Sequence, residues 1–173
     1  SSISYIGANA FNGCSKLDSF DISPSMKTIE NDTFRSCTSL KSVKIPSSIT
    51  TIGSNAFYEC ISLYKIKIPS SVTSIGQYAF CRCFNLFSAE ISSNVESIEE
   101  GVFKESSSLE KVIISSFTAS IGKDAFADCT SLNTFVVPIS LKCIGEGAFK
   151  GCTSLENIEL PLSITSIESN TFD

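Results

Sequence analysis

The chain has 173 residues, no histidine and a formal net charge of −5, and 42% of its residues are hydrophobic. The acidic balance argues against a nucleic-acid partner, which would require a clustered basic surface, and the lack of histidine excludes His-dependent catalytic triads. Because no apolar run approaches the roughly 18 residues of a membrane-spanning helix, we expect no membrane insertion in this segment.

A 23-residue unit repeats along the chain without an insertion or deletion. Its most regular position is isoleucine, at Ile6, Ile29, Ile52, Ile75, Ile98, Ile121, Ile144 and Ile167. Phenylalanine follows five residues later, at Phe11, Phe34, Phe57, Phe80, Phe103, Phe126, Phe149 and Phe172. One unit is too short to bury its own apolar face, so stacked neighbours must bury it for each other. Residues 1–173 are therefore predicted to form a single solenoid of about seven and a half repeats, a fragment that lacks both polar caps.

Within one repeat, the first predicted element is a short strand. In Leu40–Pro46, Val43 and Ile45 alternate with Ser42 and Lys44, which predicts one buried and one exposed face. Proline follows the strand in four repeats and ends the pairing there. Stacked at one strand per coil, these segments would form a parallel sheet with strands about 4.8 Å apart.

The second predicted element follows a Ser/Thr-rich bend. In the arm of residues 52–60, Ile52, Ala56, Phe57 and Cys60 have helical offsets, so one or two helical turns are expected on the side away from the sheet. The predicted fold class is thus an α/β solenoid with a parallel sheet on its concave face and short helical turns on the other side.

The pattern L-x-x-[IV]-x-I-P-x-S-[IV]-T-x-I-G-x-x-A-F-x-x-C, nearly complete in residues 40–60 and 63–83, resembles the leucine-rich repeat of BspA-like surface proteins. The resemblance covers the whole chain. It implies a curved solenoid and a place among the cell-surface or secreted adhesins of bacteria and parasitic protists, which bind host matrix proteins and other cells. It carries no catalytic residues, so we expect a non-enzymatic protein.

Six of the eight cysteines share one column of the repeat, and Ser106 takes that place in the fifth repeat. We expect these to be buried free thiols that act as small hydrophobic residues. Neither a zinc site nor a cofactor is expected, because there is no CxxC pair and no histidine. Cys81 lies beside Arg82, in a column that includes Asn12, Arg35, Tyr58, Lys104 and Lys150, so it is predicted to be the accessible, fastest-reacting thiol.

The outward strand positions vary most between repeats, and a binding surface is therefore expected among them. The candidate partner-binding residues are Lys41, Lys44, Tyr64, Lys65, Lys67 and Phe87. They combine clustered positive charge with aromatic area, a combination typical of protein-binding surfaces. Farther along the same face, Ile113 and Val136 precede an acidic end at Glu156 and Glu159.

The leading functional hypothesis is an extracellular or cell-surface adhesion module that binds a protein ligand, such as a host matrix or cell-surface protein, through the concave face. The alternative is a cytoplasmic scaffold that targets an attached signalling domain, and a third possibility is a simple spacer. Self-association through the uncapped ends is also possible in principle, because each end would present an unpaired coil.

Three departures from the repeat rule fall within residues 87–120, and they predict the weakest stretch of the solenoid there. Ala89 replaces a branched aliphatic residue, Ser106 replaces the core cysteine, and Thr118 takes an apolar bend position. Shortening a buried aliphatic side chain to alanine costs about 2–5 kcal/mol when a cavity remains. Phe84 or Phe87 could fill such a cavity.

Overall fold

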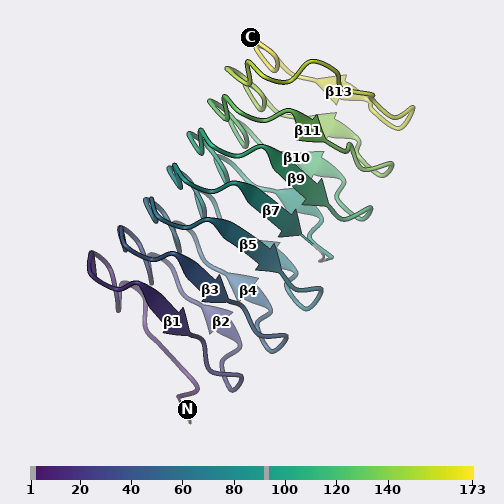
Figure 1. Cartoon of the computed structure of the whole chain (residues 1–173). Coiled ribbons are helices and arrows are strands. Elements are labelled where there is room, and N and C mark those ends of the chain that lie inside the picture. The colour runs from purple at the N-terminus through teal and green to yellow at the C-terminus, as the bar shows by residue number, and fades with distance from the viewer. Residues whose placement is uncertain (1–2, 92–93) are drawn as a thin grey trace.

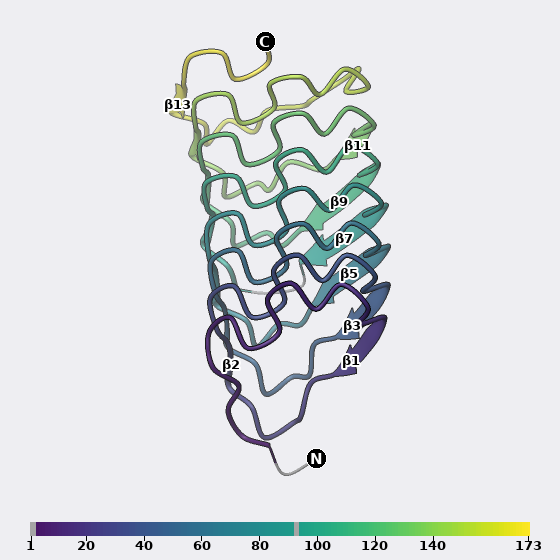
Figure 2. The same cartoon turned by 90° about the vertical axis from the view of Figure 1, so that its left-hand side faces the viewer.

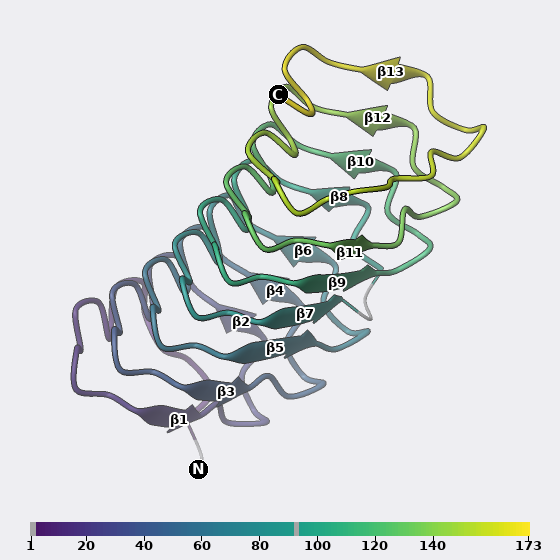
Figure 3. The same cartoon turned by 45° about the horizontal axis from the view of Figure 1, so that its top comes forward.

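Each 23-residue repeat forms one coil, and the first six complete coils have two short strands on opposite sides (Figures 1, 2 and 3). The seventh has only a back strand, so its front segment with Glu156 and Glu159 is not a strand. The structure, a computed structural model, describes residues 3–91 and 94–173. The front strands are β1 (Ser19–Asp21), β3 (Ser42–Lys44), β5 (Lys65–Ile68), β7 (Ser88–Ile91), β9 (Lys111–Ile114) and β11 (Thr134–Phe135). The back strands are β2 (Thr28–Ile29), β4 (Thr51–Ile52), β6 (Ser74–Ile75), β8 (Ser97–Ile98), β10 (Ser120–Ile121), β12 (Cys143–Ile144) and β13 (Ser166–Ile167).

All strand pairs are parallel and join residues one repeat apart, for example Ile66 with Ala89 and Ile52 with Ile75. On the front side, β1 and β3 form a two-stranded sheet, and β5, β7, β9 and β11 form a four-stranded one. The alternation predicted for residues 40–46 is confirmed in direction, since Ile45 is buried and Val43 half-buried whereas Ser42 and Lys44 are exposed. The second, back sheet was not predicted from the sequence.

The predicted helical turns are wrong, because no helix occurs in residues 3–91 or 94–173. Each arm instead contains two residues with left-handed φ angles, such as Asn55 (54°) and Glu59 (57°), which a right-handed helix cannot accommodate. Alternate amides of the arm then point along the stack. Asn55, Phe57 and Glu59 donate to the carbonyls of the next coil at 3.0, 2.8 and 2.9 Å. The arms are therefore a third set of hydrogen bonds between coils.

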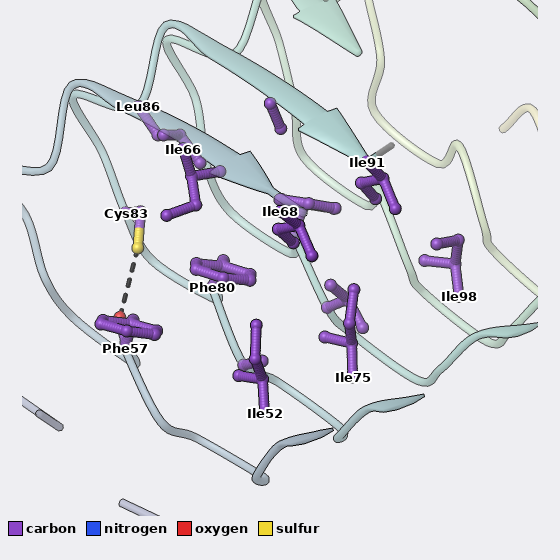
Figure 4. Close-up of a cluster of buried hydrophobic side chains, with 14 of the residues drawn as sticks. Ile52, Phe57, Ile66, Ile68, Ile75, Phe80, Cys83, Leu86, Ile91 and Ile98 are labelled. Atoms are coloured by element: carbon purple, nitrogen blue, oxygen red, sulfur yellow. Dashed lines mark hydrogen bonds between the residues drawn. The ribbon is translucent and has the colours of Figure 1, made fainter. Parts of the chain in front are cut away.

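The core is a continuous column of apolar side chains between the two sheets (Figure 4). The phenylalanine rings lie nearly parallel. The ring centroids of Phe57 and Phe80 are 5.2 Å apart with 4° between the ring planes, and those of Phe80 and Phe103 are 5.6 Å apart with 12° between the planes. Phe57 and Phe80 are completely buried, which confirms the predicted burial of this column. The stack of coils bends along its length (Figure 3), and the exposed surface of the front strands is called the front face below.

The cysteine column lies within this core between Cys37 and Cys129. Each thiol donates to the carbonyl of a phenylalanine in the preceding coil, as Cys83 does to Phe57 at 3.3 Å (Figure 4). Ser106 donates to the carbonyl of Phe80 at 3.0 Å, so the serine reproduces the same contact. The expectation of buried free thiols is therefore confirmed for the inner coils, while Cys14, in the first coil, is exposed.

The prediction for Cys81 is wrong. Its side chain is only 3% exposed, and burial, followed by the charge of Glu105, raises the pKa of the thiol to about 12. Arg82 lowers the pKa of Cys81, as expected, but does not outweigh burial. The exposed thiol in the described residues is Cys14.

Residues 87–120, of which 92 and 93 lie outside the described residues, remain the predicted weak stretch, although two of the three departures are compensated. Ser106 is satisfied as described, and the buried hydroxyl of Thr118 donates to the Val95 carbonyl at 2.8 Å. Ala89 stays uncompensated, because Phe84 is exposed and Phe87 packs on Tyr64 instead.

We expect the backbone amides around Ala89 to exchange with solvent faster than those of residues 40–75, because alanine buries less apolar surface than Ile66 and Val112 at the same position of the neighbouring coils. Hydrogen exchange followed by mass spectrometry measures this difference. Equal protection along all the inner coils would contradict the prediction.

Candidate protein-binding surface

The six candidate residues lie together on the front face. Lys44, Lys65 and Lys67 belong to β3 and β5, whereas Lys41, Tyr64 and Phe87 immediately precede β3, β5 and β7. The peptide groups of that preceding position join neighbouring coils, since Tyr64 donates to the Lys41 carbonyl at 3.2 Å and Phe87 to the Tyr64 carbonyl at 2.8 Å. We call Lys41, Lys44, Tyr64, Lys65, Lys67 and Phe87 the basic–aromatic surface.

The two aromatic side chains form one unit. Their ring centroids are 5.6 Å apart with an angle of 16° between the planes, and the ammonium group of Lys65 lies 5.4 Å from the Tyr64 centroid. Tyr64 is 53% exposed and Phe87 is half-buried. Because the stack holds both rings in place before a ligand arrives, binding would cost little side-chain entropy.

The four lysines differ in how far neighbouring acids neutralise them. Lys67 pairs with Glu90 on the adjacent strand, at 2.8 Å between Nζ and Oε1. In residues 3–91 and 94–173, Lys41 and Lys44 form no ion pair, although Asp21 is the strand partner of Lys44 on the other side. The available positive charge therefore lies mainly on Lys41, Lys44 and Lys65.

Two depressions accompany these residues. One, of about 520 Å³, lies across β3, β5 and β7 and is lined by Lys44, Lys65, Lys67 and the apolar side chains beneath them. It coincides with the boundary between the two-stranded and four-stranded front sheets. The other, of about 430 Å³, is lined by Tyr64, Phe87 and Glu110 among others. The surface thus offers a charged hollow beside an aromatic one.

The most strongly coupled charged groups lie elsewhere, on the arms. Arg82 bridges Glu59 at 3.2 Å and Glu105 at 3.0 Å, and these hydrogen bonds raise its pKa. A hydrogen bond to Glu100, with burial, raises the pKa of Tyr78 to about 12. Perturbed groups often mark catalytic sites, but these are paired between adjacent coils, so they hold the arms together.

The structure also exposes apolar side chains that the sequence reasoning did not treat as a site. Val136 is 64% exposed and Ile113 43% on the front face, and Phe117, Ile139 and Leu162 are exposed at the bends. A sequence signal existed for the bends, because Ile139 and Leu162 occupy a column that holds serine at Ser47, Ser70 and Ser116. Exposed apolar positions that the core does not require often indicate a contact surface.

Comparison with known proteins places this architecture in a family. The model of the BspA type leucine rich repeat region matches in six copies, over residues 4–133 and 119–173. No curated protein matches the chain. In the described part of the chain, no helix is long and apolar enough to cross a membrane.

Several solved structures are similar. A leucine-rich repeat protein from Eubacterium ventriosum is 34% identical, with a TM-score of 0.85 over 90% of this chain and 42% of that protein. The T. pallidum leucine rich repeat protein is 28% identical, with a TM-score of 0.82 over 90% of this chain and 72% of that one. A leucine rich cell surface protein from Faecalibacterium prausnitzii is 27% identical, with a TM-score of 0.56 over 95% of this chain and 53% of that protein. This chain therefore spans less than half of the Eubacterium protein and belongs to the BspA-type leucine-rich-repeat family.

Proposed function

We propose that this chain is a non-enzymatic, extracellular protein-binding module that attaches a cell to protein ligands through the basic–aromatic surface. The observation that carries the proposal is the stack of the exposed Tyr64 ring on the half-buried Phe87 ring, with Lys65 beside it. Aromatic side chains held in place supply most of the affinity at protein interfaces. Nearby cations steer an acidic partner toward the surface.

Two further observations support this reading. The repeat is used in a protein described as a leucine rich cell surface protein, which has the same fold. The charged groups on the arms are paired with one another, whereas Lys41 and Lys44 form no ion pair in residues 3–91 and 94–173. The ligand we propose is therefore a protein whose surface is both acidic and apolar, such as a matrix protein.

The test is binding of the chain to immobilised fibronectin, laminin and collagen, with albumin as the reference surface, followed by surface plasmon resonance. Lys44→Glu/Lys65→Glu should lower the association rate and reduce its dependence on salt. Tyr64→Ala/Phe87→Ala should raise the dissociation rate. The loss of binding free energy should be about 1–2 kcal/mol for each ring that acts as an anchor. Lys67 is left unchanged because Glu90 already engages it.

The matched control is Lys27→Glu/Lys142→Glu, which changes the net charge equally at two exposed positions beside the back strands. This variant should bind as the parent does. If the parent chain binds none of the three matrix proteins more strongly than it binds albumin, the proposed adhesion is refuted. Binding that survives both front-face variants would place the contact elsewhere and refute the proposed surface.

A further inference from the structure

The charges of this chain are divided unequally along the stack. Residues 1–86 carry eight Lys and Arg against five Asp and Glu, a net charge of +3. Residues 87–173 carry five against thirteen, a net charge of −8. The solenoid is therefore basic at one end and acidic at the other, and two copies side by side attract each other most when their stacking directions are opposite.

The front face repeats this division in single residues. Lys41 and Lys44 lie in the coil of β3, and Glu156 and Glu159 lie five coils farther on, in the same two columns. All four are exposed, and in residues 3–91 and 94–173 none of them forms an ion pair. At about 4.8 Å per coil, the basic and acidic pairs are separated by about 24 Å.

The apolar side chains of the front face lie between these charged pairs. Tyr64 and Phe87 are in the third and fourth coils, and Ile113 and Val136 are in the fifth and sixth. Phe87 is half-buried and the other three are exposed. The face thus has a basic end and an acidic end, and Lys67, Glu90 and Glu110 lie among the apolar side chains of its middle. Its two charged ends are complementary when the stack is reversed.

We infer that the basic–aromatic surface binds a second copy of this chain, face to face, about a two-fold axis that runs along the strands between β7 and β9. This inference rests on the proposed function, since it names a partner for the same surface. The axis exchanges the second coil with the seventh, so Lys41 faces Glu156 of the second copy and Lys44 faces Glu159. Symmetry repeats both contacts, which gives four ion pairs, two at each end of the contact. Between them Val136 faces Lys67, and Phe87 faces Glu110 of the second copy.

The contact is small. Four residues at about 3.3 Å by six coils at about 4.8 Å give a face of about 380 Å², which is smaller than the roughly 800 Å² per partner of a standard interface. The association is therefore weak, salt-sensitive and suited to contacts between many copies held on opposing surfaces.

The test is sedimentation equilibrium of the purified chain over a wide concentration range, at about 20 mM and about 500 mM salt. The parent should form dimers, more weakly at high salt. Lys41→Glu/Lys44→Glu and Glu156→Lys/Glu159→Lys should each weaken self-association by at least about tenfold, since each reversal opposes like charges at all four contacts. An equimolar mixture of the two variants should restore dimers to within about threefold of the parent, because every contact in the mixed dimer again joins opposite charges.

Lys27→Glu/Lys142→Glu and Glu96→Lys/Glu168→Lys are the matched controls, with the same charge changes at exposed positions beside the back strands. Each should dimerise like the parent. The inference would be overturned if the parent stays monomeric or if the mixture of variants fails to form dimers. It would also be overturned if none of the charge reversals changes self-association, a result that would point to contacts through the ends of the stack. Growth into large oligomers would also overturn it, because a two-fold pairing closes on itself.

Matrix binding separates this inference from the proposed function. Monomeric parent protein that binds a matrix protein through Lys44 and Lys65 would sink the dimer and leave the adhesion module intact. Dimers that recover on mixing, with no binding to any matrix protein, would do the reverse. Glu156→Lys/Glu159→Lys is informative in both assays, because it should abolish self-association while matrix binding through the basic–aromatic surface persists.

Discussion

Replacing Phe80 by alanine is expected to lower the free energy of unfolding by about 3–5 kcal/mol. The Phe80 ring is completely buried and lies between Phe57 and Phe103, with centroid distances of 5.2 and 5.6 Å. Alanine would leave a cavity in the middle of the ring stack. The neighbouring coils cannot close it, because the strands and the arms fix their spacing on three sides. Urea unfolding followed by circular dichroism measures the change.

Phe117→Ala is the matched control, since Phe117 is 66% exposed at a bend. Its effect should stay within about 0.5 kcal/mol, as for most surface substitutions. Phe172→Ala should lie between the two, because Phe172 contacts Phe149 on one side only and is 46% exposed. Equal losses for Phe80 and Phe117 would show that the ring stack is not what holds the coils together.

The core could be predicted from the sequence because the same type of apolar residue recurs at each inward position in several repeats. Ile52, Phe57 and Leu63 stand for columns whose inner members are all buried. The front strand followed from period-two alternation for the same reason. These inferences depend on burial alone, and burial is what the repeat conserves along the stack.

The arm was misread because apolar offsets cannot distinguish a helix from a chain of turns. Ile52, Ala56 and Phe57 share a face in both conformations. The distinguishing signal was the column that contains Asn9, Asp32, Asn55, Gly101 and Asp124, since these residue types tolerate left-handed φ angles. Thr51 before Ile52 was a second signal, for a back strand.

The sequence could predict which residues lie on the candidate surface, but not which contacts their side chains make. Strand alternation places Lys44 and Lys67 outward, and identical columns place Glu90 beside Lys67, but the 2.8 Å ion pair and the aromatic stack emerge only from side-chain positions. Cys81 shows the same limit. Arg35 and Tyr58 reach solvent from its column, whereas the shorter cysteine is covered by its neighbours.

Thiol labelling of the folded chain is therefore expected to modify Cys14 first and Cys81 only after local or global opening. Cys14 is exposed in the first coil, whereas Cys81 is 3% exposed. Because the pKa of Cys81 is about 12, almost none of it is the reactive thiolate at pH 8. Mass spectrometry after brief iodoacetamide treatment should find label on Cys14 and almost none on Cys81 or Cys60. Labelling of Cys81 as fast as Cys14 would contradict the structure.

Because the pKa of Cys81 is raised in the folded state, the free energy of unfolding should decrease as the pH rises in the alkaline range. The folded state keeps Cys81 protonated above the ordinary thiol pKa of 9.0, where the unfolded chain begins to lose that proton. Its stabilising effect is therefore complete below about pH 9 and is lost as the pH rises from about 9 to 12. The urea midpoint of the parent should fall over this pH range. The midpoint of Cys81→Ala should fall less steeply, whereas that of the control Cys14→Ala should fall as steeply as the parent's. Parallel slopes for the parent and Cys81→Ala would mean that other groups, such as the buried thiols of Cys37 and Cys60, account for the loss.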